Sequence, residues 1–168
     1  MEVVEFGPLS DEQRSELEGD EADPFDAVGI TLEFRAKERH VALRDDGRLV
    51  ASAGLTSTQV SVGDRRFEVV GLGGVIIAAA WRGRGLARRV VEEALVRARA
   101  SGLQFVMLFC HPDRAGLYER LGFMTITSPV RVKQAHGFAP MAQRTMWRPL
   151  EPGASWPAGD VTVHDLPF

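Results

Sequence analysis

The chain has 168 residues, 45% of them hydrophobic and 26% charged, and a formal net charge of −3, which is typical of one globular domain with its own core. Its longest apolar run, Val75–Trp81, is too short to cross a membrane, and its acidic first residues do not fit a signal or transit peptide. The single cysteine, Cys110, cannot form an internal disulfide, so we expect a reducing, cytoplasmic location.

Acidic residues are concentrated at the start of the chain. Residues 1–26 carry ten acidic side chains and only Arg14 as a base, a net charge of −9, so the remaining residues carry +6. Two interpretations stay open: a solubilising acidic helix, or an acidic rim that attracts a cationic substrate. The acidic stretch and a pI near 5.8 disfavour a nucleic-acid partner.

The first half of the chain predicts a strand, a helix and then a meander. A strand is expected over Val3–Phe6, and Ser10 with Gln13 forms a capping box for a helix that ends near Gly19. After a loop, the period changes to two, which is typical of strands. Expected strands cover residues 40–43, 49–55 and 67–77, with turns at residues 45–47 and 63–64.

The second half predicts two helices among further strands. The longest helix is expected from Arg84 to Ala100, because apolar residues recur there at helical spacing, and Gly102 ends it. A buried strand (103–110) and a short helix from His111 to Gly122 follow. Residues 123–133 and 141–147 are expected to be the last strands, and residues 151–168 an extended tail rich in proline and glycine.

A glycine-rich turn crowded by arginines stands between the third strand and the long helix. Gly83 and Gly85 let an anion reach the backbone, and the free N–H groups at a helix start attract phosphate. Arg82 and Arg84 add charge and forked donors. A plain helix start is the alternative. Pairing with the glutamates four residues on, Glu92 and Glu93, would explain Arg88 and Arg89.

The identity of the phosphate ligand can be narrowed by exclusion. A Walker loop would need Gly-Lys-Ser/Thr, which is missing, and a dinucleotide fold would need repeated parallel strand–helix units. The antiparallel meander argues against the second. What remains is a diphosphate carried by a different cofactor.

Two motifs together resemble a known superfamily. Arg82-Gly83-Arg84-Gly85-Leu86-Ala87 resembles the Arg/Gln-x-x-Gly-x-Gly/Ala signature of the GNAT acyl-CoA N-acyltransferases, and Leu117–Phe123, "LYERLGF", is similar to their second signature. The resemblance covers residues 1–150 as one domain and implies an α+β fold with a central, mostly antiparallel mixed sheet flanked by helices. Residues 151–168 would form a tail that packs on this domain.

The resemblance also implies roles for individual residues. The backbone of Val75, Ile76 and Ile77 would hold the pantetheine arm and polarise the thioester, and the backbone of residues 82–87 would hold the pyrophosphate. His111 stands where an asparagine usually touches the pantetheine, with a helix cap as the alternative. Tyr118 would protonate the leaving thiolate, with packing as the alternative.

Glycines on the preceding strand and one segment of the tail add to this resemblance. Glycines at 71, 73 and 74 weaken a strand unless its backbone bends or a ligand comes close. The segment Trp156–Val161, "WPAGDV", together with Trp81, is similar to aminoglycoside 2′-N-acetyltransferases, in which an acid at the position of Asp160 contacts the substrate. Their glutamate on the strand before the CoA site is Gly73 here, so that base is missing.

The implied function is transfer of an acetyl group from acetyl-CoA, as co-substrate, to a primary amine of a small, cationic acceptor by direct attack. The base stays open among Glu68, Glu33, Asp160, His136 and the Phe168 carboxylate. Cys110 invites a ping-pong mechanism, but a small buried residue is the simpler interpretation. A non-catalytic acyl-CoA-binding module and a small nucleotide-binding domain are the alternatives. We expect no metal, no membrane partner, and a monomer or homodimer.

Overall fold

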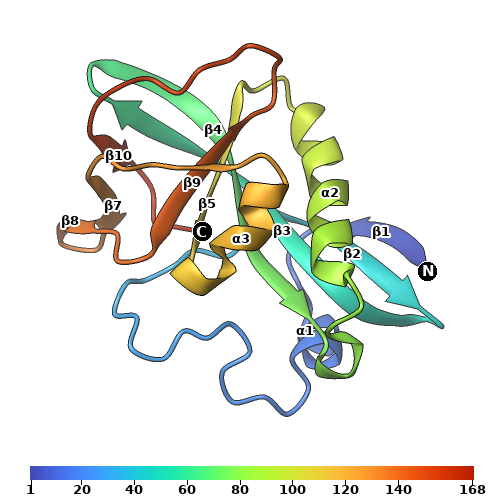
Figure 1. The fold of residues 1–168 in the computed structure, drawn as a ribbon. Helices are drawn as coiled ribbons and strands as arrows, with labels where there is room; N and C mark the ends of the chain where they lie inside the picture. Colours follow the sequence, from blue (N-terminus) through green and yellow to red (C-terminus); the bar gives the residue numbers. More distant parts are fainter.

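One ten-stranded sheet carries the fold, with helices on both faces (Figure 1). The computed structural model describes all of residues 1–168. The α-helices are α1 (Asp11–Glu18), α2 (Leu86–Arg99) and α3 (Ala115–Arg120), and short 3₁₀ turns cover Ala79–Trp81 and Pro112–Arg114. The strands are β1 (Glu2–Phe6), β2 (Arg39–Asp45), β3 (Arg48–Val62), β4 (Arg65–Ile77), β5 (Phe105–Cys110), β6 (Met124–Thr125), β7 (Val130–Gln134), β8 (Gly137–Pro140), β9 (Arg144–Pro149) and β10 (Val161–Val163).

The sheet is mixed and mostly antiparallel, which confirms the predicted fold class. Its order is β6-β9-β5-β4-β3-β10-β7-β8, with β1 and β2 attached through β3. The long strand β3 has two neighbours along one edge, because residues 48–55 pair with β2 and residues 60–62 pair with β10. Only the β4–β5 and β7–β10 pairs are parallel.

Helix α2 covers one face of the sheet and supplies the largest part of the core. Its apolar stripe recurs at helical spacing and is buried: Leu86, Val90, Val91, Ala94, Leu95 and Ala98. Helix α1 covers the other face near one end through Leu17, and its predicted capping box is present, since Ser10 and Gln13 each accept a backbone N–H of the other. None of the helices is long and apolar enough to cross a membrane.

A bulge in β4 interrupts the alternation predicted for residues 67–77. Ser52 pairs with Ile76, but Gly54 pairs with Gly73, so β4 contains one more residue than β3 between these pairs. Gly74 has a φ of +57°, which glycine adopts at little cost. The predicted alternation is therefore wrong beyond Gly73: Val75 and Ile77 pack on the α2 face with Leu72, and Ile76 packs toward α1.

One further prediction near the end of the chain is wrong. Residues 123–133 are not one strand but two: β6 lies at one end of the sheet order, and β7 is next to last at the other end. Pro129 separates them, because proline has no backbone N–H for a ladder and restricts the residue before it. β8 was not predicted. Within the predicted extended tail, residues 161–163 form the strand β10 between β3 and β7.

The end of the tail is fastened along β3 and then crosses β4. The backbone N–H of His164 donates to Gln59, the hydroxyl of Thr58 donates to Asp165, and the N–H of Arg35 donates to the carbonyl of Pro167. The last residue, Phe168, is only 3% exposed. Its ring lies 4.9 Å from the ring of Phe109, and the chain end stands near the middle of the sheet in Figure 1.

The ring of Phe168 occupies the space above Gly71, and this predicts a stability effect. A Cβ on Gly71 would lie 2.7 Å from that ring. Gly71→Ala should therefore lower the free energy of unfolding by about 1–3 kcal/mol, as overpacking does, measured by urea denaturation. The loss should be much smaller in a Phe168→Ala background, because the ring is then gone.

Gly116→Ala in α3 is the matched control. Its Cβ would lie 3.4 Å from the flexible end of Arg120, so this change should be neutral or stabilise by about 0.5–1 kcal/mol. Equal losses for Gly71→Ala in the presence and absence of the Phe168 ring would contradict the packing assigned here.

Candidate active site

The glycine-rich turn forms an uncapped, positively charged helix start. Gly83 and Gly85 have φ values of +74° and +75°, and a Cβ on either would meet no atom within 4 Å. Helix α2 begins at Leu86, two residues later than predicted, with Gly85 as its N-cap and no side-chain cap. Its first turn holds no acidic residue, so the free N–H groups and the helix dipole face open space.

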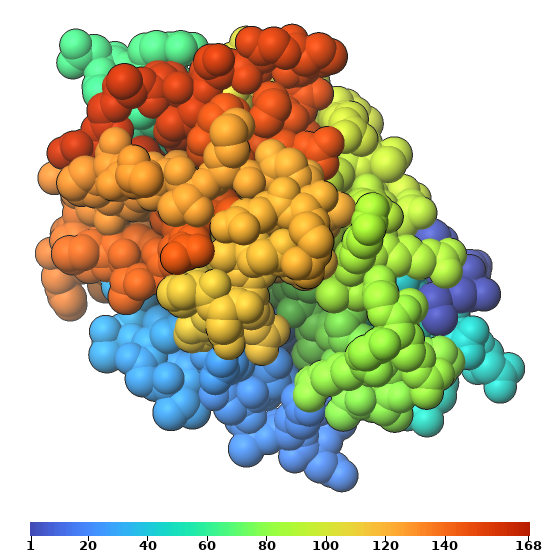
Figure 2. Space-filling model, in the orientation of Figure 1, coloured from blue at the N-terminus to red at the C-terminus, as the bar shows by residue number.

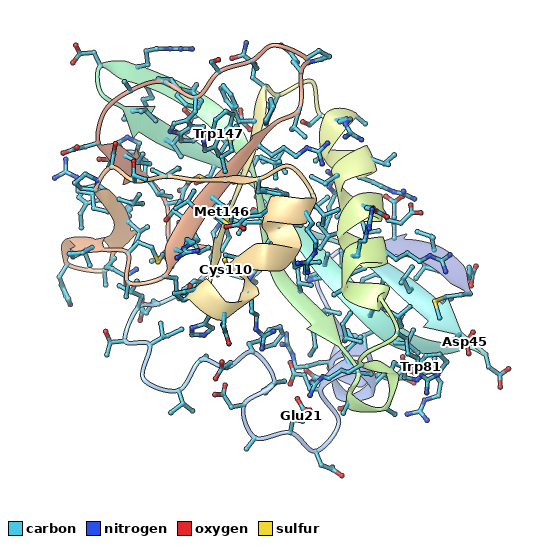
Figure 3. The ribbon with its side chains drawn as sticks, in the orientation of Figure 1. Glu21, Asp45, Trp81, Cys110, Met146 and Trp147 are labelled. Atoms are coloured by element: carbon cyan, nitrogen blue, oxygen red, sulfur yellow. The ribbon has the colours of Figure 1, made fainter.

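The arginines around this turn are held by protein groups. Arg82 pairs with Glu21 at 2.6 Å and donates to the carbonyl of Ile77, while Arg84 lies over the ring of Trp81 at 4.7 Å. Figure 3 shows Glu21 on the loop below the start of α2. The hydrogen bond to Glu21 raises the pKa of the Arg82 guanidinium. An incoming phosphate would have to share Arg82 with this carboxylate.

One of the two predicted surface pairs on α2 is present and the other is wrong. Arg88 pairs with Glu92 at 2.8 Å. Glu93 pairs with Arg97 at 2.6 Å instead of with Arg89, because Arg97 also reaches Glu5 of β1 and is fixed between the two carboxylates. Among these arginines, Arg89 thus has no glutamate partner.

An opening between β4 and β5 leads from this helix start into the sheet. The parallel ladder between these strands ends at Leu72 and Leu108, although β4 continues to Ile77 and β5 to Cys110. From Gly73 onward the edge of β4 that faces β5 is therefore unpaired, and an extended ligand could add to it as a further strand would. Figure 2 shows a hollow between the atoms of α3 and those of the start of α2.

His111 lies at the far wall of this opening, where β5 ends. Its Nε2 donates to the backbone carbonyl of Asp26 at 2.5 Å, and no side-chain hydrogen bond caps the following 3₁₀ turn. His111 is the N-cap residue of this turn through its backbone carbonyl, which accepts the N–H of Arg114, but its side chain does not cap it. Because Glu21 binds Arg82 and Asp26 binds His111, the acidic loop between α1 and β2 contacts both walls of the opening (Figure 2).

Tyr118 of α3 and Cys110 at the end of β5 are both buried in the core that α2 and α3 cover. Tyr118 is 7% and Cys110 6% exposed. Burial raises the pKa of the Tyr118 phenol to about 12 and that of the Cys110 thiol to about 11. The Cys110 Sγ lies 3.9 Å from the Met146 sulfur (Figure 3). A buried thiol that stays protonated is a poor nucleophile, which favours the structural interpretation of Cys110 over the ping-pong mechanism.

Two groups that the sequence did not bring together meet at the β4 bulge. The main-chain carbon and oxygen of Phe168 lie 2.8 and 2.9 Å from the point where a Cβ on Gly73 would stand, and Lys37 Cε lies 2.9 Å from the same point. Gly71 and Gly73 therefore leave room for the chain's own last residue and for a lysine. Lys37 was missed, since no periodicity or motif marks this loop position.

Of the five residues considered as the source of the base, only Phe168 lies at this bulge, where its main chain stands against Gly73. Glu68 is exposed near the start of β4, Glu33 lies in the loop beside Gln134, and His136 is in the turn between β7 and β8. Asp160 is exposed, and its carbonyl accepts the N–H of Gly63 at the β3–β4 turn, at the other end of β4 from the bulge.

Acidic residues gather around a cavity of about 710 Å³ next to the residues that precede the phosphate motif. It lies between the end of α1, the β2–β3 turn and residues 78–81. Figure 3 shows Asp45 and Trp81 on its rim. Six carboxylates line it: Glu16, Glu18, Asp20, Glu21, Asp45 and Asp46. The acidic start of the chain thus creates a negative field beside the opening.

Comparisons with known proteins decide the family. Residues 7–123 match the sequence model of the acetyltransferase (GNAT) family. The chain belongs to this family. A 50-residue segment is 42% identical to glucosamine 6-phosphate N-acetyltransferase 1 of Oryza sativa subsp. japonica. This segment covers 30% of this GNAT chain and 30% of the rice protein.

Solved structures show the same GNAT fold. A GNAT family N-acetyltransferase (YhbS) from Escherichia coli, in complex with CoA, has a TM-score of 0.61 at 19% identity over 96% of this chain and 89% of its own. A phosphinothricin acetyltransferase from Sinorhizobium meliloti, in complex with AcCoA, has a TM-score of 0.59 at 17% identity over 94% of both chains. A GNAT family acetyltransferase from Brucella melitensis, in complex with acetyl-CoA, has a TM-score of 0.57 at 18% identity over 97% of this chain and 96% of its own.

Proposed function

We propose that this GNAT protein transfers an acetyl group from acetyl-CoA to the primary amine of a small, cationic acceptor. The observation that carries the proposal is the continuity of two features: the uncapped start of α2 and the unpaired edge of β4 beyond Leu72. The first suits a pyrophosphate. The second suits the amide groups of an extended pantetheine arm, which can pair with free backbone N–H and C=O groups.

The reaction is a direct attack of the amine nitrogen on the thioester carbonyl. The N–C bond forms, the C–S bond breaks, and the amine gives up a proton. The bulge frees backbone N–H groups around Gly74 and Val75, and we assign these as the donors to the developing oxyanion. A direct attack needs no nucleophilic side chain, which agrees with the burial and the raised pKa of the Cys110 thiol.

Tyr118 is the residue that meets the leaving sulfur. A phenol with a pKa of about 12 stays protonated at neutral pH and can donate a hydrogen bond. Complete proton transfer to a thiolate of pKa near 8.5 would be uphill. Tyr118 therefore stabilises the departing thiolate as a donor, and water completes the protonation.

The acceptor amine approaches the bulge from the face of the sheet opposite α2, where the main chain of Phe168 lies beside Gly73. Water takes the proton once attack on the carbonyl has made the nitrogen acidic. The six carboxylates of the neighbouring cavity attract a cationic acceptor toward the opening.

Gly85→Glu tests the cofactor site. The new carboxylate would fill the open space at the helix start and repel phosphate. Calorimetry should show that the unchanged protein binds acetyl-CoA at a micromolar level, about −7 to −8 kcal/mol, and that the variant does not. Gly102→Glu is the matched control, because Gly102 has the same backbone conformation (φ +76°) at the other end of α2. Tight binding retained by Gly85→Glu would reject the site.

Tyr118→Phe tests the donor. It keeps the edge-on packing against Phe123 and removes only the hydroxyl. With thiol release from acetyl-CoA as the readout and a panel of amines as acceptors, kcat should fall by about 10²-fold with little change in KM for acetyl-CoA. An unchanged kcat would reject the donor role and show that Tyr118 contributes only to packing. Thiol release with none of the amines would favour a binding module.

Ionic strength tests the cationic acceptor. kcat/KM for a cationic amine should fall as salt rises, because charges are screened over about 8 Å at physiological ionic strength. Asp160→Asn, at the far end of β4 from the bulge, should change neither KM nor this salt dependence. A preference for neutral or anionic amines without salt dependence would contradict the cationic acceptor.

A further inference from the structure

The side chain of Lys37 runs from the acidic loop across two strands to the bulge. Its Cγ lies 2.4 Å from the place of a Cβ on Gly54, its Cε lies 2.9 Å from that on Gly73, and its Nζ lies 3.7 Å from that on Gly74. Gly54 and Gly73 are partners in the β3–β4 ladder. Both glycines leave room for the lysine, and its amine therefore ends above the residue that bends β4.

The surroundings of Lys37 favour the neutral amine. Burial lowers the pKa of its ammonium group to about 8, and the positive charges of Arg14 on α1 and Arg35 in its own loop act in the same direction. A neutral amine carries the lone pair that a nucleophile needs, and the side chain is still partly exposed.

We propose that Lys37 is a self-acetylation site of this protein. This rests on the proposed function, because acetyl-CoA bound along the β4–β5 opening would bring its thioester to the bulge. The Nζ of Lys37 attacks the thioester carbonyl carbon, an N–C bond forms and the C–S bond breaks. The nitrogen loses a proton, which converts the released thiolate to the CoA thiol. The products are CoA and Nε-acetyl-Lys37, so no further reactant is needed.

Acetylation would change the acceptor side of the site. The amide product is uncharged and stable, so it is no intermediate of transfer. It leaves an acetyl group above Gly73 and Gly74, and it removes the basic amine of Lys37. An acceptor that needs this space would be excluded until the modified lysine moves away.

The composition of the chain makes the test simple, since Lys37 and Lys133 are its only two lysines. Lys133 is exposed on β7, away from the bulge, and serves as the internal control for chemical acetylation. The purified full chain is incubated with acetyl-CoA, and intact-mass spectrometry with fragmentation locates added acetyl groups. The variants are Lys37→Arg and Lys133→Arg, and the thermal midpoint and acetyl-CoA binding of each are measured in parallel.

We expect one acetyl group on Lys37, gained about tenfold or more faster than on Lys133 because the bound thioester raises the effective concentration at one amine. The rate should saturate with acetyl-CoA, should not depend on protein concentration, and should fall when free CoA competes. Lys37→Arg should bind acetyl-CoA and gain no acetyl at position 37, and Lys133→Arg should behave like the unchanged protein.

Two results would overturn the proposal and can be told apart. If acetyl-CoA binds but Lys37 gains no more acetyl than Lys133 and the N-terminus, Lys37 is no acetylation site and the proposed function stands. If acetyl-CoA does not bind to the unchanged protein, both fail. The location of the acetyl group in the unchanged chain decides the question even if Lys37→Arg folds poorly.

Discussion

The bulge at Gly74 is the constraint on which the site depends. It inserts one residue into β4 opposite β3, and it turns the backbone at the point where β4 leaves β5. The first effect moves Val75 and Ile77 to the α2 face, so the strand's final residues still find a core. The second leaves a row of backbone groups without partners. An opening inside a sheet is costly unless a ligand or water satisfies those groups, which is why it indicates binding.

The start of α2 adds a positively charged region at the end of the same opening. A helix whose first turn has no acid and is surrounded by arginines lacks the counter-charge that helix starts prefer. Glu21 supplies part of it from the acidic loop by pairing with Arg82. This pair is exposed to water, which weakens its attraction, so a phosphate can replace the carboxylate at small cost. The loop that reaches Arg82 also reaches His111, and it therefore borders the whole opening.

The last residues of the chain complete the acceptor side. β10 fixes the tail against β3, and Phe168 then fills the space that Gly71 leaves on β4. The burial of this ring holds the main chain of Phe168 beside Gly73, next to the side chain of Lys37. Two segments far apart in the sequence thus meet at one point of the site. Glycines in the strand are what let both come so close to its backbone.

The sequence by itself determined the parts of this protein that depend on local order. The capping box at Ser10, the meander, the long helix and the phosphate motif all follow from neighbours within a few residues, and the structure contains each of them. It could not show the bulge, because one inserted residue shifts a register between strands and leaves no local signal. Only the tertiary structure brought Phe168 and Lys37 to Gly73, and placed Asp160 at the far end of β4, because these contacts join segments far apart in the chain.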